Sequence, residues 1–469
     1  MLIVPHWYWS RRTNLLQLAA FTASLVPLLF ASLTATPVLA DQKPVATLPT
    51  PITDELYHPY DENRALLGQK LFYDPLVSGN RNISCATCHH PDLASADGLP
   101  LGIGEGGSGI GKNRTVGSGQ DLIRRRVPRN SPALFNLGAL EFTSLFHDGR
   151  VEIDEKDPSG FDSPADEDTP TGLMTILAAQ ALFPLTSDVE MAGQGTENDI
   201  GQALEDIYGN PWKSVWAKVE QRLRQSEPYL PLFQNAYPEI RSAKDITIVH
   251  YANAVGDFVN AEWRSSQSPF DRYMAGELQA LTEQQQTGLD LFYGRANCAA
   301  CHSGPFLTDQ KFHAIAMPQI GPGRVARLEA IRHDRGRAGA TNLIEDRYKF
   351  RTPSLRNVAL TAPYGHSGAF ATLEGVVRHH LDPVSSFEQF SLRSVALPQH
   401  PRLSNEDGFI MQDRRERRRI LAANVLKPVS LEDEEVDALI AFLQALTDAS
   451  AAPGRLGIPV SVPSGLPID

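Results

Sequence analysis

The four cysteines of the chain carry its clearest chemical signal. They fall into two copies of one pattern, Cys85-Ala86-Thr87-Cys88-His89 and Cys298-Ala299-Ala300-Cys301-His302. In a C-x-x-C-H motif, two thiols one helical turn apart bind the vinyl groups of a haem, and the histidine that follows is the proximal ligand of the iron. A zinc site or a redox-active dithiol would not need a histidine directly after both pairs. The sequence therefore predicts two covalently bound haems, attached through Cys85, Cys88 and His89 and through Cys298, Cys301 and His302.

The residues around the two motifs recur in the same order. Gly-x-x-Leu-Phe-Tyr precedes both motifs, at residues 68–73 and 288–293. Downstream, residues 130–136 match 351–357, and Phe146-His147-Asp148-Gly149 matches Gly365-His366-Ser367-Gly368. Repeated landmarks in a fixed order indicate an internal duplication. We therefore predict two haem-binding units, residues 41–270 and 271–469.

Local signals favour helices joined by long loops. Thr282-x-x-Gln285 is a capping box, and it predicts a helix that ends near Arg295, just before the second motif. Ser430-x-x-Asp433 predicts the start of another helix. The apolar residues of that helix recur on one face, which predicts core packing: Val436, Leu439, Ile440, Leu443 and Leu446.

Composition and the first forty residues indicate an exported globular protein. The 469 residues include 43 Lys and Arg and 55 Asp and Glu, a formal charge of −12, which argues against nucleic acid as a partner. Arg11 and Arg12 precede an apolar stretch at 15–33, and Val38-Leu39-Ala40 resembles a cleavage site. We predict a signal peptide over residues 1–40; a retained membrane anchor is the alternative.

The order of motifs resembles the bacterial di-haem cytochrome c peroxidases and the related MauG-type enzymes over residues 60–447. The most specific parts are the paired haem motifs, residues 351–357 with Ala362-Pro363-Tyr364, and Phe183-Pro184-Leu185 leading to Val189-Glu190-Met191. The resemblance implies a mainly α fold with two cytochrome c-like haem domains. It also implies a periplasmic enzyme that reduces hydrogen peroxide with electrons from a small cytochrome c or cupredoxin, and it allows a homodimer.

The resemblance places the peroxide site at the N-terminal haem. Splitting the O–O bond requires a proton to move from the inner to the outer oxygen, which a carboxylate over the open iron face can do. Glu190 matches the family's distal glutamate, and Gln180 matches its distal glutamine. Without the family pattern, an acidic residue in a loop would more simply be solvated.

Two departures from the family pattern concern this haem. In many family members a histidine in the Gly-rich loop caps the iron until the other haem is reduced. Here that position is Glu105, and no histidine lies between His90 and His147. We therefore predict an iron that is open without reductive activation, with Met174 or Met191 as alternative caps. In addition, His147 stands where the family commonly has an inter-haem tryptophan, so it either serves the electron transfer or makes a local or propionate hydrogen bond.

For the C-terminal haem, the resemblance implies a sixth ligand fourteen residues after His366. That residue is His380, so we predict bis-histidine ligation by His302 and His380, with His379, Met411 and Met317 as weaker candidates. The family also binds calcium between its domains, and Asn130, Thr361 and Pro363 match those contacts. Neutral oxygen ligands with waters suit Ca²⁺.

Three functions remain open at this stage. The first is a peroxidase. The second is a MauG-like enzyme that uses peroxide to oxidise a protein substrate, which the missing loop histidine favours and the missing tryptophan disfavours. The third is a non-catalytic di-haem electron carrier, which would need both irons to be six-coordinate.

Overall fold

The protein contains two pairs of packed helices, each with a glycine at the point where the helices cross. In the first pair, α1 (Glu62–Tyr73) packs on α7 (Ile248–Glu262). A Cβ atom at Gly68 would lie 2.0 Å from the carbonyl oxygen of Ala254 and 2.7 Å from the Cβ of Phe258. No larger residue fits at this crossing, because the backbones of the two helices are in direct contact.

The second pair repeats this arrangement in the C-terminal half. Helix α9 (Glu283–Tyr293) packs on α16 (Asp433–Gln444). A Cβ atom at Gly288 would lie 1.9 Å from the carbonyl oxygen of Ala438 and 2.8 Å from the Cβ of Phe442. The phenylalanine rings correspond as well, since Phe72–Phe258 and Phe292–Phe442 have ring centroids 5.1 and 5.2 Å apart.

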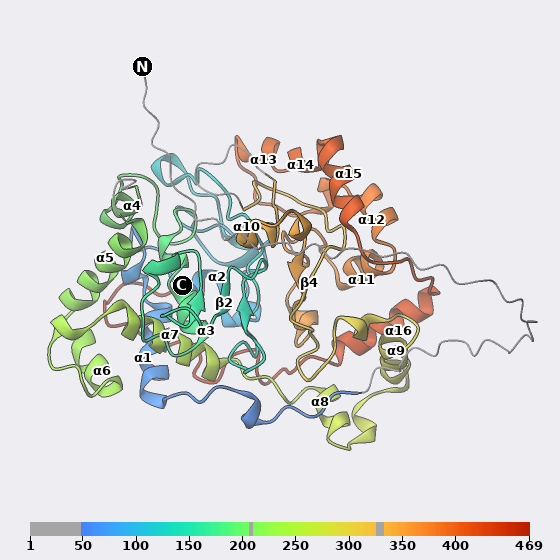
Figure 1. Cartoon of the computed structure of the whole chain (residues 1–469), viewed down its shortest axis with the longest axis horizontal. Coiled ribbons are helices and arrows are strands. Elements are labelled where there is room, and N and C mark those ends of the chain that lie inside the picture. The colour runs from blue at the N-terminus through green and yellow to red at the C-terminus, as the bar shows by residue number, and fades with distance from the viewer. Residues whose placement is uncertain (1–47, 206–209, 325–332) are drawn as a thin grey trace, which may run out of the picture. The chain divides into compact units, whose positions relative to one another are not determined.

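The computed structural model describes residues 48–205, 210–324 and 333–469 (Figure 1). The predicted signal peptide lies outside them. Within these residues, no helix is long and apolar enough to cross a membrane. The further helices of the N-terminal half are α2 (Cys85–Cys88), α3 (Ile176–Ala181), α4 (Asp199–Leu204), α5 (Pro211–Gln225) and α6 (Tyr229–Ala236). Those of the C-terminal half are α8 (Pro269–Met274), α10 (Ala338–Thr341), α11 (Leu373–Leu381), α12 (Pro383–Gln389), α13 (Leu403–Glu406), α14 (Phe409–Gln412) and α15 (Arg414–Ala423).

Strands are few and short, so the prediction of a mainly helical fold is confirmed. Strands β1 (Ser144–Leu145), β2 (Val151–Ile153) and β3 (Phe161–Asp162) form an antiparallel sheet around the His147-Asp148-Gly149-Arg150 turn. Strands β4 (Phe312–His313) and β5 (Phe350–Arg351) pair antiparallel after the second haem motif. Both ribbons are too small to form a core, and they serve to fix loops beside the haem motifs.

The capping-box predictions have different outcomes. Helix α9 begins after Thr282, whose side chain accepts a hydrogen bond from the Gln285 backbone, as predicted. The prediction for α16 is wrong by two residues, because Glu432 is the N-cap and forms its box with Glu435. The Glu435 carboxylate accepts the Glu432 backbone N–H at 3.0 Å, and the three acidic residues of the first turn interact favourably with the helix dipole.

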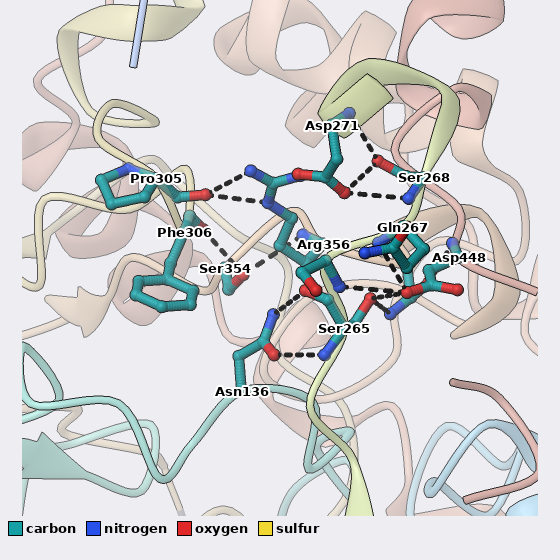
Figure 2. Close-up of polar contacts among 12 residues, drawn as sticks. Asn136, Ser265, Gln267, Ser268, Asp271, Pro305, Phe306, Ser354, Arg356 and Asp448 are labelled. Atoms are coloured by element: carbon teal, nitrogen blue, oxygen red, sulfur yellow. Dashed lines mark hydrogen bonds and ion pairs between the residues drawn. The ribbon is translucent and has the colours of Figure 1, made fainter. Parts of the chain in front are cut away.

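Equivalent asparagines hold the ends of α7 and α16. Asn136 donates its backbone N–H to the Trp263 carbonyl. Its Oδ1 accepts from the Ser265 N–H at 2.7 Å (Figure 2). Asn357 donates in the same way to Leu446, and its Oδ1 accepts from the Asp448 N–H at 2.7 Å. Both asparagines have a φ of 60°, a left-handed conformation that asparagine tolerates.

The segment between the halves is tied to both of these positions. The Asp448 carboxylate accepts from the Ser266 and Gln267 backbones, and the Nδ2 of Asn357 donates to the Ser265 hydroxyl. Arg356, the residue before Asn357, forms an ion pair with Asp271 near the start of α8 (Figure 2). The linker therefore has a defined path, fixed by buried polar groups.

The last sixteen residues lie against the N-terminal half. The side chain of Gln69 in α1 donates to the carbonyls of Leu456 and Gly457, and the Asp74 carboxylate accepts from the Ser464 hydroxyl at 2.6 Å. The Asp469 carboxylate accepts a hydrogen bond from Thr87 inside the first haem motif. Residues 454–469 thus contribute to the N-terminal core. The division of the chain at residue 270 stays a prediction.

Candidate active site

The first haem motif forms a short, capped helix. The Thr87 hydroxyl accepts the Ser84 backbone N–H at 3.0 Å at the start of α2, and both cysteines lie on this single turn without a disulfide. His89 follows at the C-cap, with its Nδ1 2.9 Å from the carbonyl oxygen of Ser95. Because Nδ1–H donates to a carbonyl, Nε2 carries the lone pair that can bind a metal.

In the second motif the histidine makes the same kind of hydrogen bond, but the cysteines lie on a different backbone turn. Residues Cys298–Ala300 form a 3-10 turn that follows Asn297 in a left-handed conformation. The Nδ1 of His302 lies 3.1 Å from the carbonyl oxygen of Leu307. Its Nε2 is therefore free in the same tautomer, and burial lowers the pKa of His302 to about 4, which keeps the ring neutral.

His380 faces His302, whereas the adjacent His379 does not. The two rings of His302 and His380 have centroids 6.4 Å apart. With metal–imidazole distances of roughly 2 Å, two rings on opposite sides of one ion have centroids roughly 6 Å apart. The Nδ1 of His380 donates to the Val376 carbonyl at 2.8 Å, which leaves Nε2 free.

The neighbouring histidine is fully engaged elsewhere. The Nδ1 of His379 lies 3.1 Å from the Ser386 hydroxyl, and its Nε2 lies 2.9 Å from the Ile315 carbonyl oxygen. Successive residues of a helix point about 100° apart, so one residue decides which ring faces His302. Met411, another candidate, is buried in a separate cluster with Phe387 and Ile420.

Glu190 lies in a loop that is clamped from both sides. Its carbonyl accepts the backbone N–H of Glu105 at 3.0 Å, and the next carbonyl, of Met191, accepts the Gly79 N–H at 2.7 Å. A Cβ atom at Gly104 would lie 2.0 Å from the Val189 carbonyl oxygen, so the two loops are in backbone contact. The clamp connects Glu190 to the segment that leads into the first haem motif.

The electrostatic surroundings of Glu190 suit an acid–base group. Burial raises its pKa above the ordinary value, Arg150 and Arg324 oppose this shift, and Asp188 adds to it. Burial and Asp97 raise the pKa of the Cys88 thiol, Arg114 lowers it, and the Glu190 carboxylate makes a smaller contribution that raises it. Glu190 is therefore close enough to the first haem motif to act on it electrostatically.

Gln180 lies at the end of α3, four residues before the short turn that begins at Pro184. Its side chain is half-buried and makes no hydrogen bond to a described residue. The structure therefore places Gln180 just upstream of the Glu190 loop without joining the two side chains.

Glu105, at the loop position where the family has a capping histidine, is tied down by two asparagines. Its Oε1 accepts from the Nδ2 atoms of Asn80 and Asn82 at 2.8 and 2.9 Å, and the side chain is 3% exposed. Burial raises the pKa of this carboxyl. Glu105 thus links the Gly-rich loop to the residues before Cys85.

His147 makes the local hydrogen bond that the sequence left as one alternative. Its Nε2 lies 3.0 Å from the Asn130 carbonyl oxygen, and its own carbonyl accepts from the Arg351 backbone at 2.8 Å. Burial and the charge of Arg129 lower the pKa of His147 to about 4, so the ring is neutral.

A buried charge cluster beside His147 escaped the sequence reasoning. Arg129 holds Asp334 through two hydrogen bonds and pairs with Asp148 at 2.9 Å, and Asp148 also pairs with Arg150 at 3.0 Å. These charges hold the pKa of Asp148 far below its ordinary range, although burial alone would raise it. The Asp148-Gly149-Arg150 sequence was the available signal, but Arg129 and Asp334, which complete the cluster, are 205 residues apart in the chain.

Asp97 is a second group that the sequence did not single out. Its side chain is 1% exposed, Oδ1 accepts from the Leu99 backbone, and Oδ2 has no hydrogen-bond partner among the described residues. Burial raises the pKa of Asp97 to about 7. No local pattern distinguishes it from a surface aspartate.

Of the residues predicted to bind calcium, Asn130 is hydrogen-bonded to the segment that follows Pro363. The Asn130 backbone N–H donates to the His366 carbonyl, three residues after Pro363, and its Nδ2 donates to the Leu99 carbonyl. The Thr361 hydroxyl donates to the Val358 carbonyl. The Asn130 carbonyl already lies against His147 Nε2, so the oxygens left to bind a cation are the Asn130 side-chain amide oxygen and the carbonyl oxygens of Thr361 and Pro363.

The residues present fit two haems. Besides the facing histidines, the buried hydroxyls of Tyr73 and Tyr293 lack hydrogen-bond partners among the described residues. These tyrosines occupy equivalent positions at the ends of α1 and α9. A buried hydroxyl without a partner indicates that a further group completes the site.

Comparisons with known proteins agree with this arrangement. Residues 62–279 match the family model described as di-haem cytochrome c peroxidase. The chain is 30% identical to the methylamine utilization protein MauG of Methylorubrum extorquens over 71% of this chain and 73% of that protein. It is equally 30% identical to the cytochrome c551 peroxidase of Pseudomonas aeruginosa, over 70% and 75% of the two chains.

A solved structure of similar shape is a MauG-like protein associated with microbial copper homeostasis. It has a TM-score of 0.55 and 26% identity, covering 88% of this chain and 96% of that one. The chain therefore belongs to the di-haem cytochrome c peroxidase family. It is an oxidoreductase, and membership of this family implies two haem c groups.

Proposed function

We propose that this protein is an exported, periplasmic peroxidase that reduces hydrogen peroxide to water at its N-terminal haem. Electrons come one at a time from a small cytochrome c or cupredoxin and enter through the C-terminal haem. The observation that carries the proposal is the clamped position of Glu190, whose charge reaches the first haem motif.

The residues of the site would have distinct roles in this reaction. His89 and His302 would hold the two irons through Nε2, each oriented by one carbonyl. The haem iron, when bound, supplies the site at which peroxide binds and from which electrons pass to peroxide. The Glu190 carboxylate would take a proton from the inner peroxide oxygen and deliver it to the outer one, so that water can leave.

The two haems would differ in what faces the iron. We infer that His380 is the sixth ligand of the C-terminal iron, because its ring lies opposite His302 at the required spacing. The N-terminal iron would stay open, since Glu105 is bonded to Asn80 and Asn82. An open iron needs no reductive activation before it meets peroxide.

Two structural proposals accompany this function. The matching glycine crossings and asparagine links support an internal duplication into two cytochrome c-like units. The oxygen atoms of Asn130, Thr361 and Pro363 would bind calcium between the units. Both proposals stand beside the peroxidase function and do not depend on it.

A MauG-like reaction, in which peroxide drives oxidation of a protein side chain, is the second candidate. The observation that favours it is Glu105 in place of a capping histidine. The two functions separate by product: a peroxidase consumes one peroxide for every two electrons taken from its donor, whereas the second reaction leaves an oxidised residue in a substrate protein.

The deciding experiment is an EPR spectrum of the oxidised holoprotein, followed by steady-state peroxide consumption. We expect one high-spin and one low-spin ferric haem, together with turnover from a small reductant. Two low-spin haems and no turnover would contradict the proposal and favour an electron carrier. Two low-spin haems with turnover only after reduction would contradict the open iron alone.

A further inference from the structure

Helix α15 presents a row of arginines on an otherwise acidic protein. Residues 393–427 contain eight Lys and Arg against four Asp and Glu, whereas the whole chain has a charge of −12. Four exposed arginines form the surface that we name the basic face: Arg414, Arg415, Arg418 and Arg419. A concentration of positive charge in a negative field is a strong local electrostatic feature.

The arginines of the basic face are largely uncompensated. Among the described residues, Arg414, Arg415 and Arg418 form no ion pair, and Arg419 pairs with Glu416 at 3.1 Å. Asp413 caps the helix by accepting from the Arg415 and Glu416 backbones, and its charge interacts with those of Arg419 and Arg415. The face therefore keeps charge available for a partner.

The opposite side of α15 is anchored. The Tyr348 hydroxyl donates to the buried Glu416 at 2.7 Å, and Ile420 is buried in a cluster with Phe387 and Ala314. Arg417 turns inward, with its guanidinium 5.2 Å from the centre of the Phe387 ring. These contacts fix the position of the helix, and with it the spacing of the exposed arginines, before a partner binds.

This anchoring places the basic face near the second haem motif. Phe387 belongs to α12, which follows α11, the helix that carries His380. Ala314 and Ala316, which pack in the same cluster as Ile420, flank Ile315, whose carbonyl oxygen lies 2.9 Å from the Nε2 of His379. Figure 1 shows α15 beside α12, with α11 directly next to them.

Exposed apolar residues lie beside the positive charge. Leu343 and Ile344 are 50% and 74% exposed, in the turn that leads to Arg347 and Tyr348. Arg347 and Arg419 both act electrostatically on the Tyr348 hydroxyl, so this turn and α15 are neighbours. Small apolar surface within a charged rim is typical of protein–protein interfaces.

We propose that the basic face is the docking surface for an acidic electron-transfer protein that supplies the C-terminal haem. The proposal rests on the peroxidase function above and adds the charge of the donor. Positive charge on the enzyme attracts an acidic donor and orients its encounter, and it repels a basic one. Such steering weakens as ionic strength rises.

The test uses one donor protein in two charge states. Mammalian cytochrome c is basic, and succinylation of its lysines makes it acidic. With holoprotein and peroxide, we expect the succinylated form to give the higher kcat/KM at low salt, falling as salt is added. The variant R415E/R418E should lose about tenfold or more with the succinylated donor. The variant R241E/K244E makes the same charge change on an exposed part of the N-terminal half and should change this value less than twofold.

Other outcomes identify what failed. If both variants lose activity equally, or if native cytochrome c is the better donor, the docking proposal is overturned. If R415E/R418E only loses binding to phosphatidylglycerol vesicles while donor kinetics stay unchanged, the face binds lipid and the proposal is likewise wrong. Hydroquinone, a small neutral reductant, should support equal turnover in all three proteins. No turnover with hydroquinone in the parent protein would contradict the peroxidase function itself.

Discussion

In both haem motifs the proximal histidine is held by the same kind of hydrogen bond. The two motifs differ in the residue that lies on the other side of the site. In both, the histidine after the second cysteine gives Nδ1–H to a carbonyl a few residues ahead, Ser95 in one motif and Leu307 in the other. In the C-terminal half a helix brings His380 to face the ring of His302. In the N-terminal half a clamped loop brings the Glu190 carboxylate near the motif.

Under the proposed function, this difference would give two similar haem motifs two different roles. A second imidazole would saturate the iron and leave it to exchange electrons only. A carboxylate leaves a coordination position open and can move protons beside it. The proximal histidines are held by hydrogen bonds to residues close in sequence. The two halves can therefore share this arrangement and still have different elements on the opposite side of the site.

The largest expected effect comes from removing the carboxylate. Replacing Glu190→Gln should lower kcat for peroxide about 10²–10⁴-fold, because the amide cannot accept the proton. Steady-state peroxide consumption measures this, with haem content checked by absorbance. The matched control is Asp188→Asn, the same chemical change two residues away, which should retain most of the activity. Equal loss in both variants would contradict a proton-transfer role.

The pH profile provides a related test. Because burial raises the pKa of Glu190 and its ionised form is the base, activity should fall as pH decreases through a value above 4.5. Asp188 contributes to that raised pKa, so Asp188→Asn should move the acid limb to lower pH. An acid limb that does not move would show that another group limits the rate.

Replacing His380→Ala should abolish the low-spin ferric signal of the C-terminal haem. The protein would then show two high-spin haems, because the iron loses its sixth ligand. The neighbouring change His379→Gln should leave the low-spin signal in place. EPR of both oxidised variants measures the outcome, and a low-spin signal that survives in His380→Ala would identify a different ligand.

The glycine crossings test the equivalence of the two halves. Gly68→Ala and Gly288→Ala should each destabilise the protein by about 2 kcal/mol or more, since the new Cβ meets a carbonyl oxygen of the partner helix. Gly339→Ala, in a short helix where the new Cβ would meet only the Arg324 side chain at 3.9 Å, should be neutral or stabilising by about 0.5–1 kcal/mol. Thermal unfolding of the holoproteins compares them, and unequal losses at 68 and 288 would show that the crossings differ.

The smallest effect concerns the motif turns themselves. Thr87→Ala gives the first motif the sequence of the second, Cys-Ala-Ala-Cys-His, and removes the hydroxyl that caps α2 and binds Asp469. We expect a loss of about 1 kcal/mol in stability with both haems still attached. Thr87→Ser, which keeps the hydroxyl, should lose less. Loss of haem attachment in Thr87→Ala would contradict a purely local role.

Local patterns predicted the helices well and their ends less well. The start of α9 was readable because Thr282 and Gln285 are three residues apart. The start of α16 differs from the prediction, since the helix begins after Glu432, two residues beyond Ser430, although serine is the better N-cap residue. The mainly helical fold followed from the same local signals, whereas the path of residues 454–469 depends on partners such as Asp74 and Gln69, which are nearly four hundred residues away.

The sequence by itself determined the haem chemistry, the repetition of its landmarks and the family. These depend on neighbouring residues: cysteine spacing, an adjacent histidine, and short motifs in a fixed order. Only the tertiary structure decided which of His379 and His380 faces His302, how Glu190 is clamped, and how Arg129 joins Asp148 and Asp334. Those arrangements join residues distant in the chain, and their energies depend on burial and orientation, which no local pattern records.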